Sequence, residues 1–377
     1  MDMKEKSELN SSDLTAVPTS PELTSPGVMV PDTGGVPELA ELVTDTTIVP
    51  AELEQQKRRK PSSPFRDSMR RLRRDKRAMA SIGVIVFFIL LALVGPTIYQ
   101  HIGGQFNSPT LGLIGPDQYH NYSIQELTLL DQGPSAMHLL GTDNIGRDIL
   151  ARLMQGILIS ITVAFLVEVI DIFLGITVGV LAGYFGGWID QLLARFTDLM
   201  FAFPGLLFVI LLTGILGSNA DAWFGSIPFL GQNGNSRLLL VSLALAFTVW
   251  PLMARYVRGQ TLQLKEQQFI EAARTSGTGS VGIILHHIIP NLFSIVFIAS
   301  TLNIANTIVG EAGISYLGLG VQDPGSSIGL MIAQATDNIQ VYPWEIMVPT
   351  VVLAIIVVAV SFFGDGLRDA FDPRSKD

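Results

Sequence analysis

The sequence predicts an all-α membrane protein with six transmembrane helices. Of its 377 residues, 48% are hydrophobic and 15% are charged, and the mean hydropathy of +0.43 is too high for an ordinary soluble domain. Six stretches are apolar over roughly the length that crosses a bilayer. Lys and Arg gather in alternate segments between these stretches, as expected of a chain that crosses a membrane repeatedly.

The six predicted spans reach or approach the ~20 apolar residues that a helix needs to cross a bilayer core. The third and fourth are short and need flanking residues to cross. The spans are Ala78–Tyr99, Ile157–Tyr184, Phe201–Leu216, Leu238–Met253, Asn291–Val309 and Ile346–Phe363.

The orientation follows from the positive charges. With the N-terminus in the cytoplasm, 21 Lys and Arg residues lie inside, and only Arg147, Arg152 and Arg237 lie outside. Cytoplasmic loops carry such an excess, so we expect a multi-pass membrane protein with both termini cytoplasmic. This topology gives a long extracytoplasmic segment, 100–152, and a cytoplasmic loop, 254–289.

The remaining boundaries follow from composition. Residues 1–56 hold eleven acidic residues and few aromatics, and we expect this cytoplasmic tail to be disordered and dispensable for transport. Residues 57–77 hold eleven basic residues. Nucleic-acid binding is one interpretation, but an apolar run follows at once, which favours contact with anionic lipid and no nucleic acid. Spans two to six form a core over 153–364, followed by a cytoplasmic C-terminus, 365–377.

Several chemistries find no support in the sequence. The absence of Cys excludes disulfides, Fe–S clusters and thiol catalysis. His286 and His287 are adjacent and would point about 100° apart on a helix, so they ligate one metal ion poorly. Gly183, Gly186 and Gly187 indicate a tight turn rather than a phosphate cradle, because no Gly-x-x-x-x-Gly-Lys-Ser/Thr pattern occurs. We therefore expect no catalytic residues, cofactor or metal.

The cytoplasmic loop carries the most specific functional signal. Gln267–Gly277 reads as a short helix with Glu271, Ala272 and Ala273 in its middle. Gly277 is placed to end this helix in a left-handed cap. A second helix over Val281–Ile289 is expected to reach Pro290 at the membrane. The first helix would then be a rigid element on which a soluble partner could push.

At these residues the chain resembles a known family. Glu271-Ala-Ala, then Gly277 and Ile288-Ile289-Pro290, resemble the EAA loop of ABC-importer permeases, in which the loop is the coupling helix that docks on an ATPase subunit. The general pattern has an apolar residue at the position of His287. His287-Ile-Ile-Pro-Asn291, however, is similar to the version typical of the dipeptide/oligopeptide branch.

Further stretches resemble the second (C-type) permease of that branch, over about residues 70–374. They are His138–Asp148, Gly183–Asp190 with Asp198 and Phe203-Pro204, Gly310–Gly320, Gly364–Asp369 and Asp372–Arg374. Two features depart from the family pattern. Ile328 stands where the branch usually has Trp, and the acidic N-terminal tail is longer than usual.

The resemblance implies the type I ABC importer permease fold, a location in the bacterial inner membrane, and an assembly with other subunits. The expected partners are a homologous second permease, two ATP-binding subunits and an extracytoplasmic substrate-binding protein. ATP hydrolysis would occur in the separate ATPase subunits. The residues that would couple to them are Glu271, Ala272, Ala273, Gly277 and Pro290.

Polar residues within the spans are candidates for the translocation path. Glu168 and Asp171 are three residues apart and share one face of the second span. Intramembrane acids are costly and often functional, but contact with a water-filled cavity would also explain them. Asn303, Asn306 and Glu311 lie on the fifth span, which lines the path in this family. Interhelical hydrogen bonding is the alternative for these three.

The sequence therefore predicts a permease subunit of an ATP-driven importer of dipeptides or oligopeptides. Nickel chelates, haem or sugars are alternative cargoes of the same branch. A secondary transporter would need its ion site within the chain, with Glu168 and Asp171 as the candidates, and would leave the EAA loop unexplained. A membrane-embedded enzyme lacks a nucleophile or metal cluster, and a pure scaffold would tolerate loss of Glu271 and Gly277.

Overall fold

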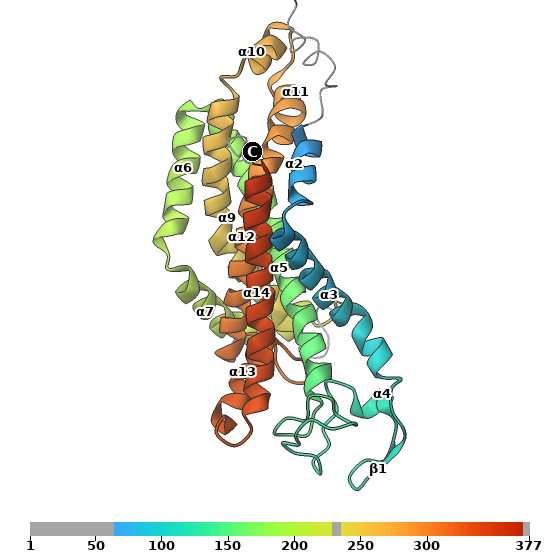
Figure 1. Cartoon of the computed structure of the whole chain (residues 1–377). Coiled ribbons are helices and arrows are strands. Elements are labelled where there is room, and N and C mark those ends of the chain that lie inside the picture. Colours follow the sequence, from blue (N-terminus) through green and yellow to red (C-terminus); the bar gives the residue numbers. More distant parts are fainter. Residues whose placement is uncertain (1–63, 228–234, 372–377) are drawn as a thin grey trace, which may run out of the picture. The chain divides into compact units, whose positions relative to one another are not determined.

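The computed structural model describes residues 64–227 and 235–371 (Figure 1). The acidic tail, the start of the basic segment and the Asp372–Arg374 signature lie outside the described residues. Helices dominate the described part. They are α2 (Pro64–Leu72), α3 (Lys76–Tyr99), α4 (Pro116–Tyr119), α5 (Ile149–Phe185), α6 (Gly187–Ala202), α7 (Gly205–Leu216), α8 (Ala220–Phe224), α9 (Ser236–Leu264), α10 (Gln268–Thr275), α11 (Ser280–Ile283), α12 (Ile289–Tyr316), α13 (Ile328–Ala335) and α14 (Pro343–Phe371).

Short elements complete the described chain. A small antiparallel hairpin, β1 (Phe106–Ser108) and β2 (Gly112–Ile114), precedes α4. The 3-10 turns η1 (Gly217–Asn219) and η3 (Thr336–Asn338) follow α7 and α13, and the π-helical turn η2 (Ile284–Ile288) joins α11 to α12.

The expectation of an all-α membrane fold is confirmed. Five helical runs in the described residues are long and apolar enough to cross a membrane: α3, α5, α9, the continuous run Ser280–Tyr316, and α14. A sixth crossing results if α6 and the α7–η1 run, which meet at an angle of 75°, count as one span. The six crossings expected from the sequence thus correspond to five continuous helical runs and one bent pair.

The third predicted span, Phe201–Leu216, is wrong as a single helix. The chain leaves helical geometry at Phe203, whose φ of −80° and ψ of 127° are extended, and α7 begins after Pro204. Proline disfavours the helical region for the residue before it and has no N–H to donate, so the helix breaks here. The apolar residues continue across the bend, which is why hydropathy alone gave one span.

Most other helices extend beyond the expected spans, and two of these differences have a local structural cause. The second span begins at Ile149 rather than Ile157, because the Asp148 carboxylate caps the helix by accepting a hydrogen bond from the Ala151 amide at 2.7 Å. The expected short helix that ends at Pro290 is instead continuous with α12. Pro290 lies in the first turn of α12, directly after the π-helical turn η2, which accommodates the missing N–H without ending the helix.

The packing of α5 on α9 depends on glycine. Gly175, Gly179 and Gly183 recur at four-residue spacing and line one face of α5. A Cβ at Gly179 would lie 2.6 Å from the Ala254 carbonyl oxygen, and a Cβ at Gly183 would lie 2.7 Å from Thr261 Cβ. Only residues without a side chain let the two backbones approach this closely. This pair forms the most extensive helix contact of the fold.

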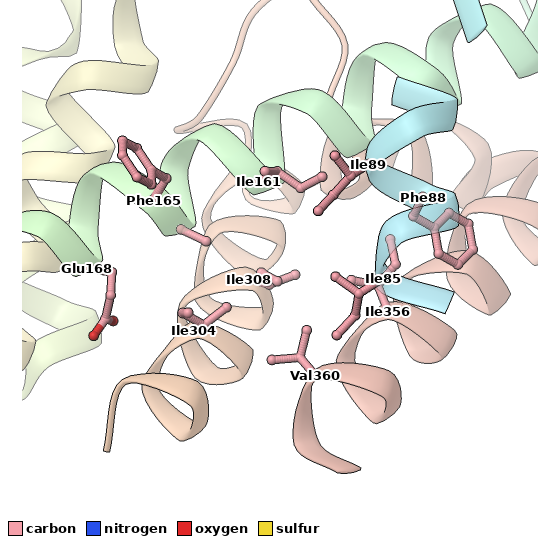
Figure 2. Close-up of a pocket in the computed structure, with 11 residues that line it drawn as sticks. Ile85, Phe88, Ile89, Ile161, Phe165, Glu168, Ile304, Ile308, Ile356 and Val360 are labelled. Atoms are coloured by element: carbon pink, nitrogen blue, oxygen red, sulfur yellow. The ribbon is translucent and has the colours of Figure 1, made fainter. Parts of the chain in front are cut away.

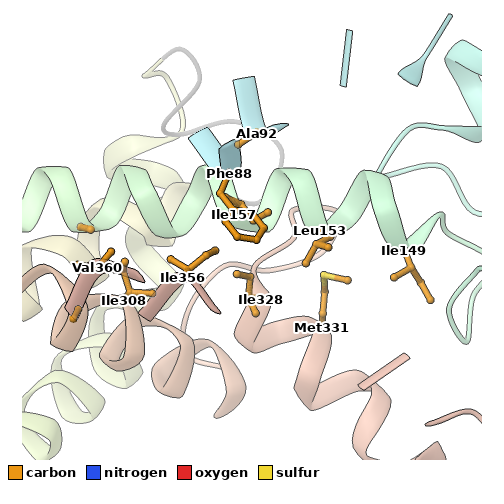
Figure 3. Packing of buried hydrophobic residues seen from close by; sticks show 12 residues of the cluster. Phe88, Ala92, Ile149, Leu153, Ile157, Ile308, Ile328, Met331, Ile356 and Val360 are labelled. Atoms are coloured by element: carbon orange, nitrogen blue, oxygen red, sulfur yellow. The ribbon is translucent and has the colours of Figure 1, made fainter. Parts of the chain in front are cut away.

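An apolar core joins the remaining long helices. Phe88 of α3, Ile157 of α5, Ile308 of α12 and Ile356 of α14 are buried together (Figure 3). Ile328, at the position where the resemblance leads one to expect Trp, is fully buried in this same cluster. The core fixes α3, α12 and α14 against α5, which itself packs along α9.

Candidate functional site

The short helix α10 is anchored by one side chain. It lies on the loop between the end of α9 and the start of α11 (Figure 1). Ile270 is fully buried in an apolar cluster with Val257 of α9, Ile283 of α11 and Leu292 of α12. A movement of α10 would therefore act directly on the ends of three helices.

The outward face of α10 is open. Glu271 and Ala272 are exposed, while Ala273 is half-buried beside the Ile270 cluster. Pro290 is also exposed, but it belongs to α12. The five residues expected to couple to an ATPase therefore do not form one surface: Glu271 and Ala272 are open, Ala273 is packed, Gly277 follows the end of α10, and Pro290 belongs to the membrane helix.

Gly277 ends α10 in the left-handed conformation that the sequence predicted, with φ of +84°. The Thr278 amide donates to the Ala273 carbonyl at 3.1 Å, and the Gly277 amide donates to the Arg274 carbonyl at 3.1 Å. These two bonds form a Schellman motif, which satisfies carbonyls at the helix end. The direction in which the chain leaves α10 therefore depends on a residue that tolerates positive φ.

The structure brings together three of the polar residues predicted within the spans. The Asn303 amide nitrogen on α12 donates to the Glu168 carboxylate and to the Asp171 carboxylate on α5, both at 3.1 Å. Glu168 and Asp171 are 7% and 1% exposed. They are therefore buried within this chain, between α5 and α12.

Glu311 and Asn306 lie apart from this cluster. Glu311 is buried and accepts hydrogen bonds from Ser160 of α5 and Ser315 of its own helix, each at 2.8 Å. This contact is the interhelical bonding that the sequence left open as the alternative to a path-lining role. Asn306 instead lies on an exposed face of α12 with Leu302 and Val309.

A buried ion network near the start of α5 was not foreseen. Arg147 Nε donates to Asp143 at 2.8 Å, Arg147 Nη2 donates to Gln334 at 3.0 Å, and Arg152 also pairs with Asp143. Burial tends to raise the pKa of Asp143, but Arg152 and Arg147 together hold that pKa below its usual value. The four-residue spacing of Asp143 and Arg147 could have indicated the pair, whereas Gln334 is distant in sequence.

A second buried contact lies beside this network. The Asp148 carboxylate accepts a hydrogen bond from the Tyr99 hydroxyl at 2.9 Å and lies 2.7 Å from His138 Nδ1. Both partners belong to the segment before α5, so they tie the end of α3 and the 138–148 stretch to the start of that helix. Within the described residues, no group of three or more His, Cys, Asp or Glu side chains could hold a metal ion.

Membrane-length helices, with a short helix anchored on the loop between two of them, define a multi-pass membrane protein. Residues 175–377 match the family of binding-protein-dependent transport system inner membrane components, and residues 63–110 match the N-terminal transmembrane domain of oligopeptide transport permease C. The chain belongs to this family of permeases, which confirms the resemblance found in the sequence.

Curated relatives cover most of the chain. The dipeptide transport system permease protein DppC of Alkalihalophilus pseudofirmus is 33% identical, over 83% of this chain and 91% of the relative. The oligopeptide transport system permease protein OppC of Bacillus subtilis is 34% identical, over 84% of this chain and 92% of the relative. A solved chain of the inward-facing MetNI methionine ABC transporter is 18% identical, with a TM-score of 0.45, and the alignment covers 58% of this chain and 96% of that one.

Proposed function

We propose that this chain is one of the two membrane subunits of an ATP-driven importer of dipeptides or oligopeptides. The peptide class comes from the names of the relatives, which are dipeptide and oligopeptide permeases. The assembly would contain a homologous second permease, two ATP-binding subunits and an extracytoplasmic binding protein. Both termini and α10 would lie in the cytoplasm, because this orientation keeps most Lys and Arg inside.

The observation that carries this proposal is the two-sided character of α10. Glu271 and Ala272 form an open surface for the ATPase subunit, and their partner can approach closely at Ala272 because that side chain is small. Ile270 transmits the movement inward, since it is enclosed by α9, α11 and α12. Gly277 sets the angle of α10 through its left-handed cap. ATP-driven closure of the two ATPase subunits would thus move the membrane helices.

The translocation path would run along the exposed face of α12. Asn306 contributes a polar side chain to that face, and Leu302 and Val309 flank it. Glu168, Asp171 and Glu311 are buried, so in this state they would support the arrangement of α5 and α12 from within the subunit. Asn303, which is half-buried, links α12 to α5 through its hydrogen bonds to Glu168 and Asp171.

Reconstitution tests the proposal. The complete transporter in proteoliposomes should accumulate radiolabelled tri-alanine only with ATP and loaded binding protein, and a protonophore should leave uptake unchanged. Ala272→Arg should abolish uptake by excluding the ATPase surface. Uptake that needs a proton gradient rather than ATP would contradict the importer mechanism. ATP-dependent uptake of a nickel chelate, haem or a sugar in place of the peptide would overturn the cargo alone.

A further inference from the structure

We propose that the bundle contains a binding site for a primary ammonium carried on an apolar body. The ammonium would be held by the acid cluster, defined here as Glu168, Asp171, Ser300 and Asn303. The apolar body would occupy an adjoining cavity between α3, α5, α12 and α14. This site is separate from the exposed face of α12 and from α10.

The cavity is the first observation. It has a volume of 260 Å³, and an apolar cavity of about 150 Å³ is large enough to hold benzene. Glu168 lies at one end of it (Figure 2) and contributes the only ionisable side chain among the lining residues. Hydrocarbon side chains make up the rest of the wall, including Ile85, Phe88, Ile161, Ile304, Ile308 and Ile356. Its occupant must therefore be largely apolar.

The incomplete hydrogen bonding of the acid cluster is the second, independent observation. Within the described residues, Glu168 Oε1 and Asp171 Oδ1 are buried carboxylate oxygens with no hydrogen-bond partner of good geometry, and the buried Ser300 hydroxyl lies beside Glu168. The Asn303 amide nitrogen contacts only the other oxygen of each carboxylate. Leaving buried acceptors without donors costs about 1–3 kcal/mol each, so the cluster favours a ligand that donates several hydrogen bonds.

The cavity and the cluster are continuous along the same helix faces. On α5, Ile161, Ala164 and Phe165 lead to Glu168 and then to Asp171 one turn further. On α12, Ile308 and Ile304 lead to Ser300 at four-residue spacing, and Ser300 lies beside Glu168. A linear molecule could therefore extend from the apolar wall to the acceptor oxygens.

The chemistry of the cluster selects an ammonium. In residues 64–227 and 235–371, neither Glu168 nor Asp171 forms a salt bridge. A carboxylate at membrane depth needs a counter-charge or a proton. A primary ammonium supplies positive charge and three N–H donors, enough for both unpartnered carboxylate oxygens and for the Ser300 oxygen beside them. A neutral alcohol supplies one donor and no charge.

Equilibrium binding of octylammonium and of octan-1-ol tests this inference. The full-length chain would be reconstituted in phosphatidylcholine nanodiscs, with empty nanodiscs giving the partition into lipid. We expect saturable binding of octylammonium, at least about tenfold tighter than binding of octan-1-ol, since hydrogen bonds to charged groups are the stronger ones. Equal affinity of the two probes would reduce the site to an apolar cavity and overturn the proposal.

Variants separate the two halves of the site. Glu168→Gln and Asp171→Asn should each weaken octylammonium binding by about tenfold and leave octan-1-ol binding unchanged. Ala164→Phe should weaken both probes by filling the cavity. Glu311→Gln is the matched control, because this buried acid has hydrogen-bond donors on both oxygens.

Unchanged octylammonium affinity in both Glu168→Gln and Asp171→Asn would overturn the proposal. So would a loss of octylammonium affinity in the control Glu311→Gln as large as the loss in these two variants. If the acid variants fail to fold, thermal unfolding of the wild-type chain still tests the proposal. Octylammonium should then raise the thermal unfolding midpoint of the wild-type chain more than octan-1-ol does, when both probes are present at equal concentration in the lipid. Equal midpoints would contradict an ammonium site.

Discussion

Replacing Gly179 by alanine should separate α5 from α9. The added Cβ would lie 2.6 Å from the Ala254 carbonyl oxygen and 2.7 Å from Val257 Cβ, well inside the 3.4 Å at which ordinary contact begins. Because the first of these neighbours is backbone, a side-chain rotation cannot relieve the contact. The two helices must move apart along a face that also contains Gly175 and Gly183.

The magnitude follows from two opposing effects. Alanine favours a helix over glycine by about 1 kcal/mol, which alone would stabilise the variant. Overpacking a tight interior typically costs about 1–3 kcal/mol. Gly259→Ala is the matched control: it lies on α9, where an added Cβ meets nothing within 4 Å in the part of the chain that the structure describes. We therefore expect Gly179→Ala to be about 1–3 kcal/mol less stable than Gly259→Ala.

Unfolding in mixed micelles would measure the difference. Sodium dodecyl sulfate titration can be followed by tryptophan fluorescence, to which the buried Trp250 of α9 contributes. Gly179→Ala should unfold at a lower detergent fraction than Gly259→Ala. Equal midpoints for the two variants would refute the reasoning that the glycine face holds α5 against α9.

Three further expectations concern charge and topology. The Ser108, Thr110 and Thr128 hydrogen bonds outweigh burial and hold the pKa of Glu126 at about 2. The protection factors of amides near the hairpin, which correct for the intrinsic exchange rate at each pH, should therefore fall as pH drops from about 4.5 towards 2, and Glu126→Gln should remove that dependence. Asp143→Asn removes the carboxylate shared by two buried arginines and should lower the free energy of unfolding by about 3–5 kcal/mol in the micelle titration; a loss below 1 kcal/mol would contradict this. A cysteine at position 271 should react with an impermeant maleimide only in inside-out vesicles, and labelling in intact cells would reverse the topology.

Hydropathy predicted the crossings because a bilayer demands a helix whose apolar length matches its own thickness. Hydropathy did not predict the bend at Pro204, because the residues on both sides are apolar and only the backbone geometry changes. The glycine face of α5 could have been predicted from the sequence, because Gly175, Gly179 and Gly183 recur at helical spacing. The helix that packs on this face could not be predicted, because no sequence feature near these glycines indicates α9.

The short helix around Glu271 and its end at Gly277 could be predicted from the sequence, because both depend on neighbouring residues alone. The positive φ of Gly277 follows from residue type and position at a helix end. Contacts between distant residues were not accessible. Asn303 contacts Glu168 from 135 positions away in the sequence. Only the packing of α12 on α5 shows that Asn303 pairs with Glu168 while Glu311 pairs with Ser160.

The central claim is that α10 transmits ATP-driven movement into the membrane helices. Gly277→Val places a β-branched residue at φ of +84°, where a side chain costs about 1–2 kcal/mol or more, although its Cβ would meet no described residue within 4 Å. Gly279→Val is the control, because that position has φ of −67° and ψ of 160° and is equally open. Any difference between the two variants therefore reports the cap at the end of α10.

ATP hydrolysis by the purified transporter, with and without loaded binding protein, measures this coupling most directly. The account predicts that Gly277→Val assembles normally but loses the stimulation of hydrolysis by loaded binding protein, while Gly279→Val retains it. Full stimulation and full uptake in Gly277→Val would contradict a coupling role for α10.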